Sequence, residues 1–224
     1  MPHPLENLSR ATAIWAVIAT ILSTGWGLDN LAGFAAEPAR VALLLMWLAL
    51  CWYGALAGTR TSNASGKIEI RKHRNVFWLV LPVLIGWFFY LPFADRHRIA
   101  TSDSVLLRWS GLILFGVAYA LRVESIRAQG AQFSCAVAIQ EQHRLTTNGP
   151  YRWVRHPAYT GVIGIMAGLS LVFANPPAAA IMSVLVWIWM ESRIRDEEKL
   201  LQQEFGSEFS RYAQRTKKLI PFLY

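Results

Sequence analysis

The sequence predicts an all-α integral membrane protein with about six hydrophobic helices, and three observations support this fold class. The chain has 224 residues, of which 54% are hydrophobic and only 16% are charged, whereas soluble domains are about one quarter charged. Its apolar runs approach the ~20 residues that a helix needs to cross a bilayer. Its Lys and Arg residues gather in alternate connecting segments, as they do in multi-pass membrane proteins.

The first 122 residues are predicted to form a region of transmembrane helices. Apolar runs cover about 11–28, 39–58, 76–94 and 104–121, with Arg40 and Arg108 each near one end of a run. The N-terminal stretch "MPHPLENLSR" lacks a basic segment, and no small-residue cleavage pattern follows it. We therefore expect the first run to be retained as a span, not removed as a signal peptide.

Residues 123–224 are predicted to contain a helical hairpin and a tail helix. A fifth apolar run ends at Phe173, the stretch "ANPPAA" breaks it, and a sixth run covers about 179–190. Prolines at this break favour a tight hairpin. Strong helix formers in "MESRIRDEEKLLQQEF" predict a tail helix that continues the sixth run and stops at Gly206. The basic, aromatic stretch "SEFSRYAQRTKKLIPFLY" suits a membrane surface.

The charge distribution predicts that both termini are cytoplasmic. With the N-terminus inside, 18 of the 22 Lys and Arg residues fall in inside segments, three fall outside, namely Arg40, Arg96 and Arg98, and Arg108 makes up the total. This bias is the positive-inside pattern. The net charge of +8 then suits cytoplasmic loops beside anionic membrane lipid. No nucleic-acid-binding motif accompanies it, so we expect no nucleic acid partner.

A polar cluster stands at the mouth of the predicted hairpin, in "YRWVRHPAYTG" at 151–161. Pro157 suits the first turn of a helix, and His156 and Tyr159 are three residues apart and share a face. Arg193 and Glu197, one turn apart on the tail helix, should face this cluster. Two plainer interpretations stay open: an aromatic and basic belt at the membrane interface and a surface ion pair.

Several kinds of site are disfavoured. Cys51 and Cys135 make no disulfide framework. The five histidines, at 3, 73, 97, 143 and 156, do not recur at ligand spacing, so we expect no metal. The sequence has no glycine-rich phosphate loop, no His-Glu-x-x-His and no Gly-x-Ser-x-Gly.

The motif "NGPYRWVRHPAYTG", the hairpin and then "RIRDEEKLLQQEFGSEFSRYAQRTKKLIPF" resemble the isoprenylcysteine carboxyl methyltransferase family and are similar to the related membrane phospholipid methyltransferases. The resemblance covers about 140–222. It implies S-adenosylmethionine as the methyl donor and a fold unlike that of Rossmann methyltransferases. Arg193 falls on a position associated with the substrate carboxylate, which makes it the expected catalytic and substrate-binding residue. The expected cofactor-binding residues are Gln140, His143, Leu145, Tyr151, His156, Pro157, Tyr159 and Glu197.

The expected reaction is O-methylation of the carboxylate of a prenylcysteine-like or other lipophilic substrate. A carboxylate is already ionised at neutral pH, so the site must supply orientation and a dry cavity, not a base. An arginine can hold a carboxylate through two parallel hydrogen bonds. We expect the lipophilic substrate to enter from the bilayer and the donor from the cytoplasm. Phospholipid N-methylation, small-thiol S-methylation and a non-enzymatic scaffold or transport subunit remain alternatives.

Overall fold

The computed structural model describes residues 4–57, 68–69, 71–134, 137–139 and 144–224. Five of its helices are long and apolar enough to cross a membrane, and a sixth, α6, is apolar but shorter. The predicted all-α membrane fold with about six hydrophobic helices is therefore confirmed. The helices are α1 (Pro4–Trp26), α2 (Leu31–Ala35), α3 (Pro38–Leu56), α4 (Arg71–Arg96), α5 (Val105–Gln129), α6 (Pro157–Val172), α7 (Pro176–Phe205) and α8 (Ser207–Arg215).

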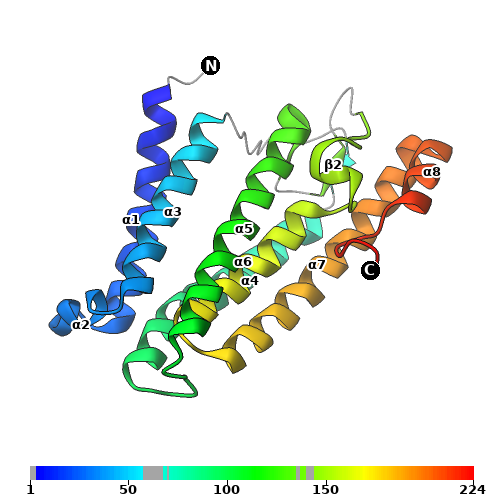
Figure 1. Ribbon diagram of the computed structural model, residues 1–224. Coiled ribbons are helices and arrows are strands. Elements are labelled where there is room, and N and C mark those ends of the chain that lie inside the picture. The colour runs from blue at the N-terminus through cyan, green and yellow to red at the C-terminus, as the bar shows by residue number, and fades with distance from the viewer. Residues whose placement is uncertain (1–3, 58–67, 70, 135–136, 140–143) are drawn as a thin grey trace.

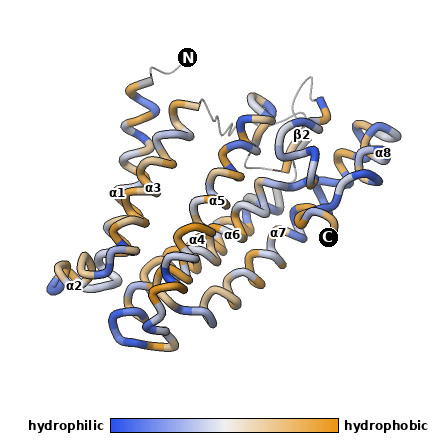
Figure 2. The backbone as a smooth tube through the Cα atoms, in the orientation of Figure 1, coloured by the Kyte–Doolittle hydropathy of each residue, from blue (hydrophilic) through white to orange (hydrophobic). Residues whose placement is uncertain are grey.

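The helices are arranged around a tightly packed pair, α5 and α6 (Figure 1). Helices α1 and α3 lie side by side on one flank, α4 packs along α1, and α7 packs along α6 and leads into α8. Hydrophobic residues dominate the middle of the long helices, and hydrophilic residues gather towards their ends (Figure 2). Large apolar side chains such as Leu79 and Leu106 are exposed on the outside, as expected for a surface that contacts lipid.

Glycines let α5 and α6 approach each other closely. A Cβ atom on Gly168 would lie 2.5 Å from the backbone nitrogen of Phe115, and one on Gly111 would lie 2.6 Å from that of Val172. Both distances are too short for any side chain, so the two backbones are in direct contact. This contact fixes α6, and with it the hairpin, against the centre of the molecule.

The hairpin between α6 and α7 forms where the sequence predicts it. Asn175 caps α7 by accepting a hydrogen bond from the backbone nitrogen of Ala178 at 3.0 Å, and prolines occupy the first turn, where their missing N–H groups cost nothing. Helix α7 then runs without a break to Phe205, so the tail helix does continue the second arm. It stops at Gly206, whose φ of 49° favours glycine.

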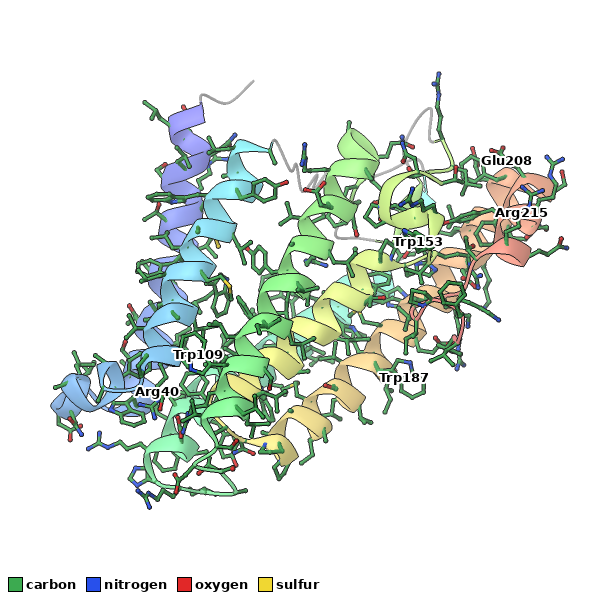
Figure 3. The ribbon with its side chains drawn as sticks, in the orientation of Figure 1. Arg40, Trp109, Trp153, Trp187, Glu208 and Arg215 are labelled. Carbon is green, nitrogen blue, oxygen red and sulfur yellow. The ribbon has the colours of Figure 1, made fainter. Side chains whose placement is uncertain are left out.

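A buried ion cluster joins four helices at the end of the bundle next to α2. Arg40, Asp95 and Arg108 are each 6% exposed. Asp95 accepts hydrogen bonds from Arg40 Nε at 2.9 Å and from both terminal nitrogens of Arg108 at 2.7 and 2.8 Å. Arg108 also donates to the carbonyl of Val172, the last residue of α6, at 3.0 Å. Arg40, which the charge pattern assigned to an outside segment, is thus a buried ion-pair partner (Figure 3).

Two minor strand contacts lie outside the all-helical prediction. Strand β1 (Ile68–Glu69) pairs antiparallel with β2 (Ala138–Ile139), and a single parallel bridge joins Val154 to Lys217. Strands this short leave no alternating pattern in the sequence. The first contact ties the segment before α4 to the segment after α5, and the second brings the C-terminus beside the start of α6.

Candidate active site

A cavity of about 360 Å³ lies at the mouth of the hairpin, within the size range of small-molecule sites. Its walls come from α4, α5, the segment after α5, α6, α7 and α8. Polar or charged side chains line one part of it: Arg122, Gln129, Gln132, Ser134, Thr146, Tyr151, Arg155, His156, Tyr159, Arg193, Glu197 and Tyr212.

Another part of the cavity wall is apolar and belongs to the membrane-crossing helices. Phe77 and Leu84 come from α4, and the other side chains come from α6 and α7: Val162, Ile165, Met166, Trp189 and Met190. Helix α4 packs chiefly against α1, and its side chains Phe77 and Leu84 line the cavity together with those of α6 and α7. The cavity therefore combines a polar mouth with an apolar wall reaching into the membrane region.

The two arms of the hairpin meet through His156, Tyr159 and Glu197. The imidazole and phenol rings are stacked, with centroids 5.6 Å apart and an interplanar angle of 13°. The Tyr159 hydroxyl donates to Glu197 Oε2 at 2.8 Å, and His156 Nδ1 lies 3.9 Å from the same oxygen. The predicted meeting of the "YRWVRHPAY" and "ESRIRDEEKLL" segments is confirmed.

Arg193 is a buried member of the cluster. It is only 7% exposed, and its guanidinium carbon lies 5.8 Å from the centroid of the Tyr159 ring, within the range of cation–π contacts. It lines the cavity one helical turn before Glu197 and one turn after Trp189. A solvated surface helix would leave such a side chain exposed, so the surface interpretation does not describe Arg193.

Glu198 is a further member of the site, which the sequence analysis did not single out. It accepts hydrogen bonds from Arg155 Nε at 2.7 Å and from His156 Nε2 at 3.2 Å. Adjacent residues of a helix point about 100° apart, so Glu197 faces the cavity while Glu198 holds the residues behind it. The sequence signal was present in the paired glutamates and in the adjacent Arg155 and His156.

The C-terminal strap, which we define as residues 216–224, lies across the start of α6. The backbone nitrogens of Arg155 and His156 donate to the carbonyls of Lys217 and Lys218 at 2.8 and 3.0 Å, and Thr160 Oγ1 donates to Leu219 O at 2.7 Å. The Arg155 guanidinium also donates to the carbonyls of Ala213 and Thr216. The strap therefore fixes the backbone that carries His156.

Two tyrosines close the polar part of the cavity. The Tyr212 hydroxyl donates to the carbonyl of Tyr151 at 2.7 Å. Burial raises the pKa of Tyr212 to about 12, and burial together with the nearby Glu197 carboxylate raises the pKa of Tyr151 well above its usual value. Both phenols therefore stay protonated at neutral pH and can act as hydrogen-bond donors.

Most of the residues expected at the site meet in this cavity. Those that line it are Leu145, Tyr151, His156, Tyr159, Arg193 and Glu197. Pro157 begins α6 and is not among the lining residues, whereas Gln140 and His143 lie outside the described residues. Other lining side chains that the sequence did not indicate include Arg122, Phe133 and Trp189. Arg122 donates a hydrogen bond to the carbonyl of Ala158 at 3.2 Å. Within the described ranges, no three His, Cys, Asp or Glu residues are placed to hold a metal ion.

The fold and the cavity together define a class of protein: a multi-pass helical membrane protein whose polar cavity lies at the mouth of a helical hairpin. Comparison with known proteins narrows this class. Residues 111–203 match the model of the isoprenylcysteine carboxyl methyltransferase (ICMT) family, which confirms the resemblance inferred from the sequence.

Curated relatives extend the match over half of the chain. Protein-S-isoprenylcysteine O-methyltransferase B of Arabidopsis thaliana is 35% identical over 115 residues, which are 50% of this chain and 58% of that protein. The probable enzyme of Oryza sativa subsp. indica is 31% identical, covering 50% and 60%. The Homo sapiens enzyme is 29% identical, covering 51% and 41%. The matched region thus spans about 60% or less of the length of these relatives.

A solved structure matches nearly the whole chain in fold. It is described as the eukaryotic intramembrane Ras methyltransferase ICMT without a monobody, and it superposes with a TM-score of 0.57 at 21% sequence identity. The match covers 98% of this chain and 85% of that one. At this identity the comparison concerns the fold, and it includes the N-terminal helices, which lie outside the residues 111–203 that the family model matches.

Proposed function

We propose that this protein is an integral-membrane methyltransferase that uses S-adenosylmethionine to methylate the carboxylate of a lipophilic, prenylcysteine-like acceptor. The observation that carries this proposal is the placement of Arg193 and Glu197 one turn apart in one cavity whose lining is partly apolar and partly polar. The matches to protein-S-isoprenylcysteine O-methyltransferases support it.

The residues at the cavity mouth suit the methyl donor. S-adenosylmethionine carries an ammonium group, a sulfonium and an aromatic base. Glu197 supplies a carboxylate for a cationic group, held in place by the Tyr159 hydroxyl. The rings of Tyr151, His156 and Tyr159 supply stacking faces and polar atoms for the adenosine. Leu145 adds an apolar contact beside them. Pro157 takes part by setting the start of α6.

Arg193 suits the acceptor carboxylate. Its position one turn deeper than Glu197 places a guanidinium between the donor end of the cavity and the apolar wall. S-adenosylmethionine, when bound, would supply an electrophilic methyl carbon to a carboxylate oxygen that Arg193 holds there: a C–O bond would form as the S–C bond breaks, and the sulfonium would become a neutral thioether. The negative and positive charges cancel and no proton moves, so the step requires orientation and exclusion of water, not a general base.

The apolar wall suits a hydrocarbon chain that enters from the bilayer. Phe77 and Leu84 on one side and Trp189 and Met190 on the other come from helices that face lipid elsewhere along their length. We propose that 123–224 is the catalytic region and 1–122 the N-terminal membrane region, of which α4 contributes this part of the wall. We also propose that both termini and the cavity mouth are cytoplasmic, in keeping with the charge distribution.

The first experiment identifies the bond that is made. Membranes containing the protein are incubated with methyl-labelled S-adenosylmethionine, lipid extract and a prenylcysteine probe, and the products are treated with alkali. We expect the label to be released as volatile methanol, because a carboxyl methyl ester hydrolyses under these conditions. Label that resists alkali would instead identify an N-methylated phospholipid or an S-methylated thiol. If folded protein gave no labelled product at all, the enzyme assignment would be contradicted.

The second experiment separates the roles of Arg193 and Glu197. We expect Glu197→Ala to weaken S-adenosylhomocysteine binding by tenfold or more, because charge-assisted hydrogen bonds are worth about 1.5–3 kcal/mol. His156→Ala should act in the same direction. Arg193→Ala should leave that binding within about twofold, a change of roughly 0.4 kcal/mol, and abolish turnover. Calorimetry and the methanol assay measure the two effects, and loss of the cofactor in Arg193→Ala would overturn the role assigned to Arg193.

A further inference from the structure

A second, shallower hollow lies beside the C-terminal strap and has the character of an anion site. Its volume is about 310 Å³, and four basic residues line it: Arg155, Arg215, Lys217 and Lys218. Among the described residues, Arg155 is the one that lines both this hollow and the candidate active site. We call the second hollow the basic groove.

The positive charge in the basic groove is only partly balanced. Arg155 pairs with Glu198 at 2.7 Å, and Lys218 Nζ lies 3.1 Å from Glu191 Oε1. Arg215 and Lys217 are exposed, and neither makes an ion pair with any residue in the described ranges. Arg215 and Lys217 therefore line the groove without an ion-pair partner among the described residues, and phosphate oxygens are good hydrogen-bond acceptors for both.

The tip of the strap is apolar and exposed directly beside these charges. Phe222 and Leu223 are 83% and 77% exposed. The adjacent Tyr224 packs edge-on against Trp187, with ring centroids 6.4 Å apart. Trp187 lies on the apolar, membrane-crossing part of α7, whereas Arg215 lies at the end of α8 (Figure 3). Because Trp and Tyr favour the membrane interface, we expect the strap tip to lie at the depth where head groups give way to acyl chains.

We propose that the basic groove binds the phosphate head group of an anionic phospholipid, while the apolar strap tip inserts among the adjoining acyl chains. Basic side chains at a membrane surface attract acidic lipids, and a neighbouring apolar segment adds burial energy. A soluble phosphate compound shares the head-group chemistry, but it makes no use of Phe222 and Leu223. This binding site is separate from the methyl-transfer chemistry, and its test does not depend on that function.

The test is a lipid titration of the full-length, detergent-solubilised protein, followed by native mass spectrometry. Phosphatidylglycerol is compared with phosphatidylcholine. We expect Arg215→Gln/Lys217→Gln to weaken phosphatidylglycerol binding roughly tenfold to thirtyfold, because each basic residue near a membrane surface contributes a factor of about five. Phosphatidylcholine binding should not change. Phe222→Ser/Leu223→Ser, which keeps every charge, should also weaken phosphatidylglycerol binding.

The matched control is Arg10→Gln/Arg211→Gln, which removes the same charge from exposed residues that do not line the groove. It should bind phosphatidylglycerol as the parent protein does. Equal loss in both double variants would show a diffuse charge effect and overturn the site. Competition by glycerol phosphate at the concentration of the lipid would overturn the lipid as occupant. Both outcomes leave the methyltransferase proposal untouched, because they are measured without donor or acceptor.

Discussion

Glu198 supports the candidate active site although its own side chain does not line the cavity. Its carboxylate holds Arg155 and His156, and Arg155 in turn donates to the last turn of α8 and the start of the strap. One side chain thus connects the stacked ring of His156 to the segment that covers it. Such a group acts by positioning, because His156, not Glu198, lines the cavity.

We expect Glu198→Gln to weaken S-adenosylhomocysteine binding about tenfold, since a lost charge-assisted hydrogen bond costs on the order of 1.5–3 kcal/mol. The amide keeps the shape of the side chain and removes its charge. Glu208→Gln, on the exposed face of α8, is the control. Calorimetric affinities that agree between the two variants would show that Glu198 does not position His156.

Asp95 is the second residue whose removal should be costly. Its carboxylate faces two buried guanidinium groups, and breaking a buried pair leaves charge without compensation at a cost of about 3–5 kcal/mol. We expect Asp95→Asn to lower the thermal unfolding temperature in detergent markedly. Asp29→Asn removes a comparable but exposed partner of Arg96 and should have little effect. A similar fall in both variants would contradict the importance of burial.

At the scale of elements, the contact between α5 and α6 governs where the hairpin stands. Gly168 meets the backbone of α5 with no room for a side chain. The first turn of α6 carries Tyr159 and follows His156, so a displaced α6 moves both rings relative to Glu197 on α7. The close packing far from the cavity mouth therefore determines the geometry at that mouth.

We expect Gly168→Ala to destabilise the protein by about 1–3 kcal/mol, the usual cost of forcing extra volume into a packed contact, and to lower donor affinity as well. Gly86→Ala is the matched control, since a Cβ atom there meets nothing within 4 Å and alanine is the better helix former. Thermal unfolding of the two variants decides the matter. A Gly168→Ala protein as stable as Gly86→Ala would show that the helices separate without cost.

At the scale of the whole molecule, the two ends of the bundle differ in chemistry. The end next to α2 contains the buried ion cluster of Arg40, Asp95 and Arg108, whereas the end that includes α8 contains the cavity mouth and the basic groove. The excess of Lys and Arg in segments near the cavity mouth predicts that this end is cytoplasmic.

This orientation is testable with single cysteines placed in a background in which Cys51 and Cys135 are replaced by serine. We expect a membrane-impermeant maleimide added to intact cells to label Arg98→Cys, in the connection between α4 and α5. It should label Arg211→Cys, on α8, only after the cells are permeabilised. The reverse pattern would place the cavity mouth outside and contradict the proposed access of the donor from the cytoplasm.

The sequence by itself determined the local features of this protein. Hydropathy located the spans, although α1 begins seven residues before the first apolar run and α5 ends eight residues after the fourth. The Asn-Pro-Pro break placed the hairpin, and Gly206 marked the end of α7. The motif around His156 and Tyr159, with Arg193 and Glu197, led to the cavity. These features could be predicted because hydropathy, caps and helix-breaking residues act over one or two turns of chain.

Only the tertiary structure decided which distant residues work together. Glu198 with Arg155, the strap across α6, the Arg40–Asp95–Arg108 cluster and the basic groove all join residues from separate elements. Two-residue strands and single ion pairs leave no periodic trace in a sequence. Their positions depend on how closely α5 packs against α6 and on how α7 packs along α6. Both are properties of the packed molecule.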